Sequence, residues 1–177
     1  QPRMLDVPMT GRGFIALPPG MLAGLEAITL EGWMRWDTVE SWRNSMFFGK
    51  DGSNLRIGTA GNPGQLQFGI SNVRRDAAGN PSWVSGAVLM APGALQVGEW
   101  VHVAGVIGTD GGRLYVNGTE VASDPNLKLS LHAGDEINQL GHGEFAGAMD
   151  EVRVWRVART GDEIRQHLFA KLTGREP

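Results

Sequence analysis

The sequence predicts an all-β fold, in which two antiparallel sheets stack on one another and one short helix lies near the C-terminal end. Short segments alternate apolar and polar residues, as half-buried strands do. Clusters of Gly, Asn, Asp and Pro separate these segments, and the 26 glycines suit many tight turns. The 177 residues contain no evident linker or repeat, so we expect a single domain over residues 1–177.

Alternation and turn residues together give the expected strands. They are Gly13–Leu17, Ile28–Trp36, Ser45–Gly49, Leu55–Thr59, Leu66–Ser71, Trp83–Met90, Trp100–Ile107, Arg113–Val116, Glu120–Ser123, Ile137–Gly141 and Ala148–Val157. The clearest hairpin turns at Asn117-Gly118, which supplies the two positive-φ residues of a type I′ turn. This turn places Leu114 and Val116 on one face and Tyr115 on the other.

The block from Phe145 to Leu168 predicts the end of the fold. Its first half is a strand in which Val152 and Val154 share one face while Glu151 and Arg153 share the other. A strand of this kind has one face for the core and one for polar contacts.

The second half of this block predicts a short helix. Thr160 and Glu163 form a capping box, in which each side chain bonds the backbone N–H of the other residue. Ile164 and Leu168 then give the helix an apolar stripe that can pack on a sheet.

The same block resembles the end of laminin-G-like, pentraxin-like domains of the concanavalin A-like lectin/glucanase superfamily. Three further stretches fit that family in the right order: Ile28–Trp36, Gly98–Ser123 and Ile137–Glu151. The resemblance implies an antiparallel jelly-roll β-sandwich. It also implies a non-catalytic, lectin-like recognition module, usually one piece of a larger extracellular or cell-surface bacterial protein.

Composition excludes several classes of function. A net charge of −3 gives no basic field, so we expect no nucleic-acid partner. The absence of cysteine excludes disulfides, zinc thiolate sites and a cysteine nucleophile, and leaves the cellular compartment open. No apolar run reaches the roughly 20 residues of a membrane span, so we expect no membrane insertion.

The sequence does not predict an enzyme. A glycosidase on such a sandwich needs two converging carboxylates, and the family's E-x-D-x-x-E or E-x-D-x-E run is missing. Asp150 and Glu151 are adjacent, so they would point to opposite faces of an extended strand. No G-x-S-x-G is present, and His102 lies in an apolar strand that favours a structural role. A hydrolase site assembled across strands is the remaining enzymatic alternative.

Metal binding depends on Asp150. The resemblance implies a structural calcium held by an acidic turn near the N-terminus together with the aspartate at this position. The turn that aligns, Thr10–Phe14, has no carboxylate and contains Arg12. We therefore expect either no cofactor or a structural calcium at Asp150, with an ion pair or hydrogen bonds as the favoured role of that side chain. His132 and His142 fall in predicted loops without a second ligand at a useful spacing.

Two polar segments supply the candidate ligand-binding residues. Ser71–Trp83 is the longest irregular stretch, and Val39–Ser45 is a second loop. Together they contain cationic, amide and aromatic side chains, in which planar rings can cover the face of a sugar and polar groups can reach its hydroxyls. These residues are Trp42, Arg43, Arg74, Arg75, Asn80 and Trp83. A solvated hairpin excursion explains Ser71–Trp83 equally well. Strand tryptophans, in contrast, are expected to fill the core or pack at edges. They are Trp33, Trp36, Trp100 and Trp155.

We therefore expect a non-catalytic carbohydrate-binding module that selects its ligand with end loops or with a concave sheet face. The partner would be a glycan or an extracellular or cell-surface protein. A protein-interaction or oligomerisation module, for example a homo-oligomer, is the main alternative. Aromatic side chains along the concave face would favour a glycan, and an apolar face would favour a partner chain.

Overall fold

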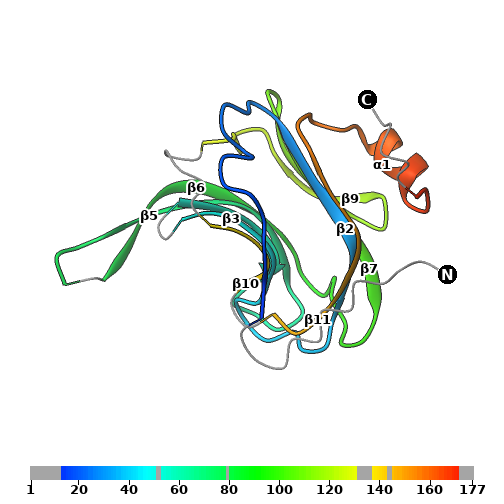
Figure 1. Cartoon of the computed structure of the whole chain (residues 1–177), viewed down its shortest axis with the longest axis horizontal. Coiled ribbons are helices and arrows are strands. Elements are labelled where there is room, and N and C mark those ends of the chain that lie inside the picture. The colour runs from blue at the N-terminus through cyan, green and yellow to red at the C-terminus, as the bar shows by residue number, and fades with distance from the viewer. Residues whose placement is uncertain (1–12, 51–52, 79, 131–136, 143–144, 172–177) are drawn as a thin grey trace.

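In a computed structural model of the chain, two antiparallel sheets stack face to face (Figure 1). The structure describes residues 13–50, 53–78, 80–130, 137–142 and 145–171. The six-stranded sheet has the order β1 (Ile15–Ala16), β10 (Ile137–His142), β3 (Asn44–Lys50), β4 (Ser53–Thr59), β5 (Leu66–Arg75) and β6 (Pro81–Ala91). The five-stranded sheet has the order β11 (Gly147–Trp155), β2 (Ile28–Trp36), β7 (Trp100–Gly108), β8 (Gly111–Val116) and β9 (Thr119–Asp124).

The predicted fold class is confirmed, and each expected strand overlaps an observed one. Asn117 and Gly118 turn the β8–β9 hairpin with φ values of 49° and 76°, as a type I′ turn requires. The helix α1 (Gly161–His167) begins after Thr160, and both hydrogen bonds of the capping box with Glu163 are formed. The turn residues of the β8–β9 hairpin and the capping residues of α1 therefore predict the positions of both elements correctly.

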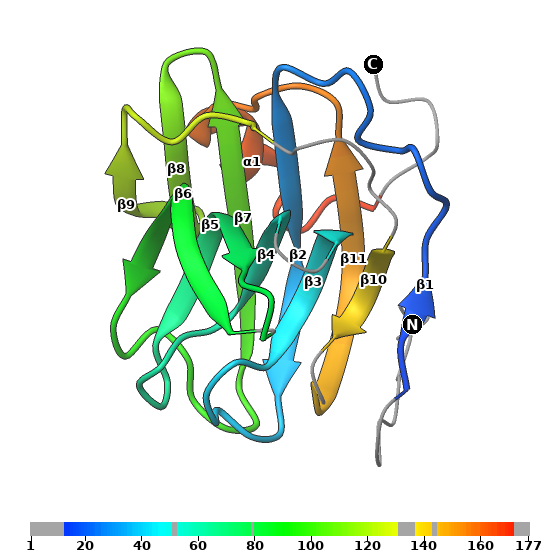
Figure 2. The ribbon, with the colours of Figure 1, turned by 90° about the vertical axis from the view of Figure 1, so that its left-hand side faces the viewer.

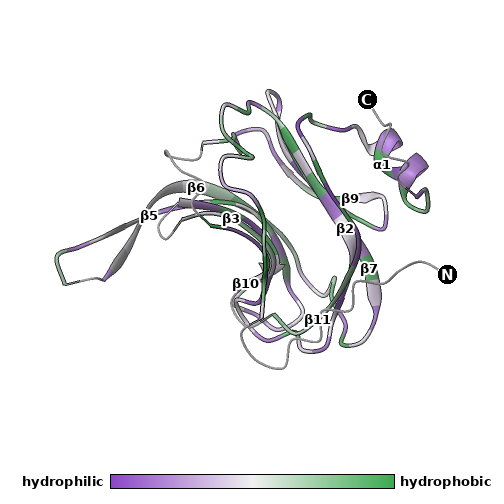
Figure 3. Ribbon diagram, in the orientation of Figure 1, coloured by the Kyte–Doolittle hydropathy of each residue, from purple (hydrophilic) through white to green (hydrophobic). Residues whose placement is uncertain are grey.

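The core lies between the sheets because every second residue of a strand points inward. In β2, Leu30 and Met34 join the core, whereas Glu31 and Trp33 lie on the opposite face. Hydrophobic and hydrophilic residues accordingly alternate along the ribbon of this strand (Figure 3).

The two sheets approach closely in the middle of the sandwich. A Cβ atom at Gly105 of β7 would lie 2.3 Å from the ring of Phe68 in β5. Only glycine therefore leaves room for this ring. Phe68 is fully buried, as are Trp36 and Phe145, whose rings meet edge to face with centroids 5.8 Å apart.

The six-stranded sheet bends so that its outer face is concave (Figure 1). Figure 2 looks onto this face, with the strands in order from β6 to β1 across the view. Gly49 and Gly86 have φ values of 123° and 125°, which L-residues rarely adopt. Glycine at these two positions lets the backbone take a conformation that ordinary strand residues resist.

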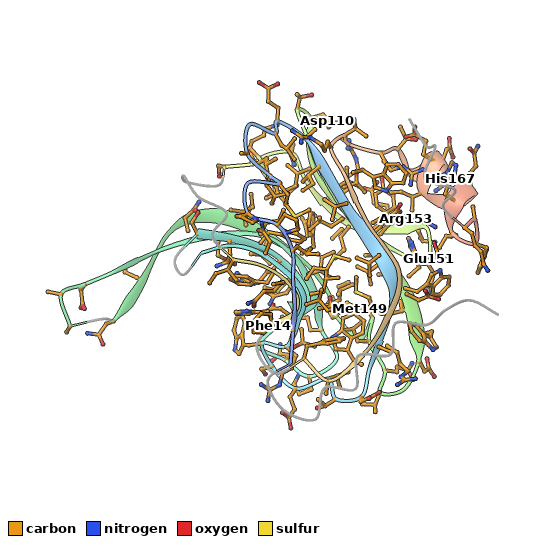
Figure 4. All side chains as sticks on the ribbon, in the orientation of Figure 1. Phe14, Asp110, Met149, Glu151, Arg153 and His167 are labelled. Carbon is orange, nitrogen blue, oxygen red and sulfur yellow. The ribbon has the colours of Figure 1, made fainter. Side chains whose placement is uncertain are left out.

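A β-bulge interrupts β11 between Asp150 and Arg153. Glu151 has a φ of 50°, so the backbone there is not extended. Asp150 pairs with Trp33 on the outer face, and the Glu151 carboxylate reaches Arg153 on that same side, 3.0 Å away (Figure 4). The expected placement of Asp150 and Glu151 on opposite faces held for an extended strand, and the bulge removes that condition.

The helix α1 packs on the outer face of the five-stranded sheet through one apolar contact and a buried polar cluster. Ile164 is fully buried beside Tyr115. Beneath the helix, the Glu31 carboxylate accepts hydrogen bonds from the Arg159 guanidinium and from the Trp155 indole N–H, both at 2.7 Å. Glu31 is fully buried and Arg159 nearly so, and the buried Arg153 guanidinium lies 3.7 Å from the same carboxylate oxygen, so the cluster compensates its charges internally with Arg159 as the closest cation.

No helix within the described ranges has the length and apolar character needed to cross a membrane.

Removing the partner of Glu31 should weaken the whole fold. We expect Arg159→Ala to lower the free energy of unfolding by about 3 kcal/mol, because it leaves a buried carboxylate without its closest cation. Arg156→Ala, which truncates an exposed arginine of the same segment, should change it by less than about 0.5 kcal/mol. Urea unfolding of both variants measures the difference, and equal losses would contradict the role given to Arg159.

Candidate functional site on the concave face

Cross-strand pairing arranges the outer face of the six-stranded sheet in rows. The neighbouring inward residues, among them Met46, Phe48, Leu55 and Ile57, belong to the core, so the residues between them face outward. The middle row consists of Gln139, Phe47, Arg56, Gly69 and Val88. The two flanking rows are Ile137, Gly49, Asn54, Ser71 and Gly86, and His142, Asn44, Gly58, Gln67 and Met90.

Two aromatic rings stack at one side of this concave face. Phe47 and His142 lie with ring centroids 4.0 Å apart and an interplanar angle of 17°. Gln139 holds the imidazole through a 2.7 Å contact between its Oε1 and His142 Nδ1. Burial lowers the pKa of His142 below its ordinary value, which favours the neutral imidazole. Phe47 is buried at 7% exposed, so the half-buried His142 is the ring of this pair that presents an uncharged aromatic surface.

Amide side chains form a polar band next to the rings. Gln67 donates from Nε2 to the carbonyl oxygen of Thr59 at 2.7 Å, which fixes the orientation of its amide. Asn44 is buried, and its Oδ1 accepts no hydrogen bond from any residue that the structure describes. Gln67 and Asn44 are buried, whereas Asn54 and Gln139 of the same face are half-buried and can offer amide donors and acceptors to hydroxyls.

Arg56 occupies the centre of the middle row and is half-buried. Its guanidinium donates from Nη1 to Asn54 Oδ1 at 2.6 Å and from Nη2 to Gln67 Oε1 at 3.5 Å. Burial lowers the pKa of Arg56 from its ordinary value, and an arginine remains a cation nonetheless. The three rows contain no carboxylate, so Arg56 is their single charged side chain.

The first predicted loop lies at one end of this sheet. Trp42 has a φ of 64°, is 55% exposed, and its ring approaches Gly61 in the β4–β5 turn. Arg43 pairs with Glu40 at 2.8 Å. Trp42 and Arg43 therefore lie on a loop at the edge of the concave face and not on the face itself.

The second predicted segment forms the β5–β6 hairpin at the other end of the sheet, as the alternative of a hairpin excursion anticipated (Figure 1). Asn80 is exposed and bonds Asp76 within the turn, with a side-chain contact of 3.0 Å. The backbones of Arg74, Arg75 and Trp83 lie in these strands, and their side chains fall outside the described part of the structure.

The two predicted segments therefore do not form one cluster. They lie beyond opposite ends of β5, whose ten residues span about 30 Å. Ligand binding by Trp42, Arg43, Arg74, Arg75, Asn80 or Trp83 stays a prediction for each loop separately.

The Asp150 side chain makes a local hydrogen bond within β11. Its Oδ1 accepts from the backbone N–H of Glu151 at 2.9 Å. Among the described residues there is no group of three or more His, Asp or Glu side chains that could hold a metal ion. Residues 10–12 of the aligned turn lie outside the described ranges. Structural calcium at Asp150 thus stays a prediction.

Sequence reasoning missed Phe47 and His142. Strand alternation places the Phe47 side chain opposite to those of Met46 and Phe48, but all three residues are apolar, so polarity along the chain does not show which of them faces outward. His142 was placed in a loop, whereas it ends β10. No pattern along the chain could pair these two rings, because they meet only through the β10–β3 register.

The strand tryptophans divide between the core and the outer face of the five-stranded sheet. Trp36 is fully buried in the core, as expected. Trp33 packs beside Phe169, Trp100 lies under the Arg35 guanidinium, and Trp155 lies under that of Arg159. These three are half-buried and lie on the face opposite to the concave one.

Comparison with known proteins identifies the family. A model of the concanavalin A-like lectin/glucanases superfamily matches residues 10–165. The chain belongs to this superfamily. The order of motifs along the sequence had indicated the same relationship. No curated protein matches the chain in sequence.

Solved structures of this superfamily's fold resemble the chain at low sequence identity. Domain 4 of AbnA, an extracellular arabinanase from Geobacillus stearothermophilus solved with arabinotriose, is 17% identical over 86% of this chain and 71% of that one, with a TM-score of 0.65. The CBM40 of a Ruminococcus gnavus sialidase, bound to α2,3 sialyllactose, is 14% identical over 88% and 96%, with a TM-score of 0.61. A heptameric pentraxin from Limulus polyphemus is 16% identical over 92% and 75%, with a TM-score of 0.55.

A cluster of charged side chains lies buried beneath α1, on the face opposite to the concave one. His102 is 1% exposed, with its Nε2 3.8 Å from Glu31 Oε2 and its ring edge to face with Trp33. Burial lowers the pKa of His102 to about 4, against the opposing effect of Glu31. A neutral, inaccessible imidazole suits the structural role expected from the sequence.

The neutral state of His102 predicts a pH-dependent stability. The unfolded chain binds a proton at this side chain near its ordinary pKa of 6.5, whereas the folded chain does so only at about 4. Stability should therefore fall as the pH falls between these values, by about 2 kcal/mol at about pH 5. Urea unfolding at about pH 7 and pH 5 should show a clearly larger loss in the wild type than in His102→Gln, in which the lowered pKa of His142 still contributes. His142 and His167 are common to both proteins, so an unchanged pH dependence in the variant would contradict the assignment.

Proposed function

We propose that this chain is a non-catalytic, lectin-like module that binds carbohydrate on the concave face of its six-stranded sheet. The observation that carries the proposal is the combination of the stacked Phe47–His142 pair with an adjoining band of amide side chains. A sugar has an apolar ring face and a rim of hydroxyls. An aromatic ring covers the first, and amides bond the second.

The polar composition of this face supports binding without catalysis. Hydrolysis of a glycosidic bond requires two carboxylates roughly 5 to 10 Å apart. The three rows of the concave face contain amides, a hydroxyl, an imidazole and a guanidinium, and none of these replaces that pair. A glycosidase is therefore the least supported of the alternatives.

The structural neighbours support a carbohydrate ligand and a place outside the cell. The AbnA domain was solved with arabinotriose and belongs to an extracellular enzyme, and the CBM40 domain was solved with sialyllactose. By analogy, this chain would serve as a recognition module of a larger secreted or cell-surface protein.

A protein-interaction or oligomerisation module is the second candidate. The outer face of the five-stranded sheet carries Trp33 and Trp100, and Phe169, which packs beside Trp33, is 85% exposed. Exposed aromatic side chains are common at protein interfaces. The pentraxin neighbour is a heptamer, which shows that this fold can assemble.

The location of the site can be tested with two single variants. We expect His142→Ala to weaken glycan binding by about five- to tenfold, because it removes one aromatic surface from the concave face. Trp42→Ala, a matched aromatic deletion on the loop rim, should bind as the wild type does. Glycan-array screening followed by titration calorimetry of the best ligand measures both affinities.

The opposite pattern of affinities would place the binding site on a loop. Loss of binding in Trp42→Ala with none in His142→Ala would favour the Val39–Ser45 loop and contradict the concave face. A wild-type protein that binds no glycan but shows a mass that rises with concentration would favour the oligomerisation module instead.

A further inference from the structure

We propose that the carbohydrate recognised by the concave face carries an anionic group, a carboxylate or a sulfate, and that Arg56 binds this group. The inference rests on the proposed function and adds the chemical class of the ligand. It follows from the position of Arg56, from its lack of a counter-ion and from its unfilled hydrogen-bonding capacity.

Arg56 lies where a bound sugar would be held. It is directly opposite Phe47 in the β3–β4 pairing, so the Cβ atoms of the two residues are about 5 Å apart. Across the other edge of β4 its partner is Gly69, which has no side chain to cover the guanidinium. A sugar that lies against the Phe47–His142 stack would therefore bring its substituents within reach of Arg56.

No acidic side chain compensates this cation. Within the described part of the chain Arg56 forms no ion pair, and burial alone, with no neighbouring charge, accounts for the lowered pKa of its guanidinium. Other half-buried or buried arginines of this protein do have carboxylate partners: Arg35 has Asp37, and Arg159 has Glu31. A partly buried cation without a partner is costly for the free protein.

The neighbours of Arg56 orient the guanidinium without saturating it. Asn54 accepts one short hydrogen bond, and the contact with Gln67 is at the limit of hydrogen-bond distance. The Nε atom is buried and has no acceptor among the described residues. The buried Nε lies out of reach of a ligand, but the two terminal nitrogens can donate parallel hydrogen bonds to a carboxylate or a sulfate, so an anionic substituent would supply the missing charge.

Binding to matched ligand pairs tests this proposal. The wild type is screened on an array of neutral, carboxylated and sulfated glycans, and its best ligands are then titrated beside the same glycans after methyl esterification or desulfation. We expect the anionic form to bind at least about tenfold more tightly than its neutralised counterpart, and the esterified and desulfated pairs distinguish a carboxylate from a sulfate. Arg56→Gln should abolish this preference, so that the anionic and neutral forms bind with similar affinity.

Two further variants separate recognition from folding. Arg56→Lys keeps the charge but not the paired donors, so it should show a reduced preference for the anionic form. Arg35→Gln, which removes an arginine on the opposite outer face, should leave the preference unchanged. Urea unfolding of each variant shows that it is folded under the binding conditions.

The outcomes distinguish this inference from the proposed function. Equal affinity for the anionic and neutral forms, or a preference that survives Arg56→Gln, overturns the role of Arg56 and leaves carbohydrate binding in place. Failure to bind any glycan on the array overturns both proposals.

Discussion

The alternation of residues across the six-stranded sheet is the constraint on which the concave face depends. Core packing holds this register: the ring of Phe68 in β5 rests on Gly105 of the opposite sheet, and Met46 and Phe48 of β3 are buried in the same core. With those residues inside, Phe47 must point outward. A slip of one residue in any strand would exchange the core and outer sets. The apolar core therefore determines which side chains are available to a ligand, although it touches none.

The two outer faces of the sandwich differ in how their charged side chains are compensated. On the five-stranded sheet, Glu31 is compensated by Arg159 and covered by α1, so its charges are satisfied within the protein. On the concave face, Arg56 has amides for neighbours and no carboxylate within the rows that surround it. Charge that is neutralised internally stabilises a fold, whereas charge without a partner is available to a ligand. This contrast is the physical basis for placing recognition on the concave face.

The architecture could be predicted from the sequence because its signals are local. The Asn117-Gly118 turn, the capping box of Thr160 and Glu163, and the alternating strands each act within a few residues. The candidate site could not be predicted in this way, since Phe47 and His142 meet through strands far apart in the sequence. Loop composition pointed instead to Trp42 and to the β5–β6 hairpin. The bulge at Glu151 was also beyond prediction, because tertiary packing, not local preference, places a non-glycine residue at positive φ.

The central claim, that a glycan binds the concave face, is tested most directly by mapping the ligand contact in solution. At 19.1 kDa the isotope-labelled protein suits amide chemical-shift mapping during titration with the best glycan of the array. The account predicts that the largest shifts fall on β3, β4, β5 and β10, centred on Phe47 and Arg56. Shifts confined to the Val39–Ser45 loop, to the tip of the β5–β6 hairpin or to the face beneath α1 would contradict it.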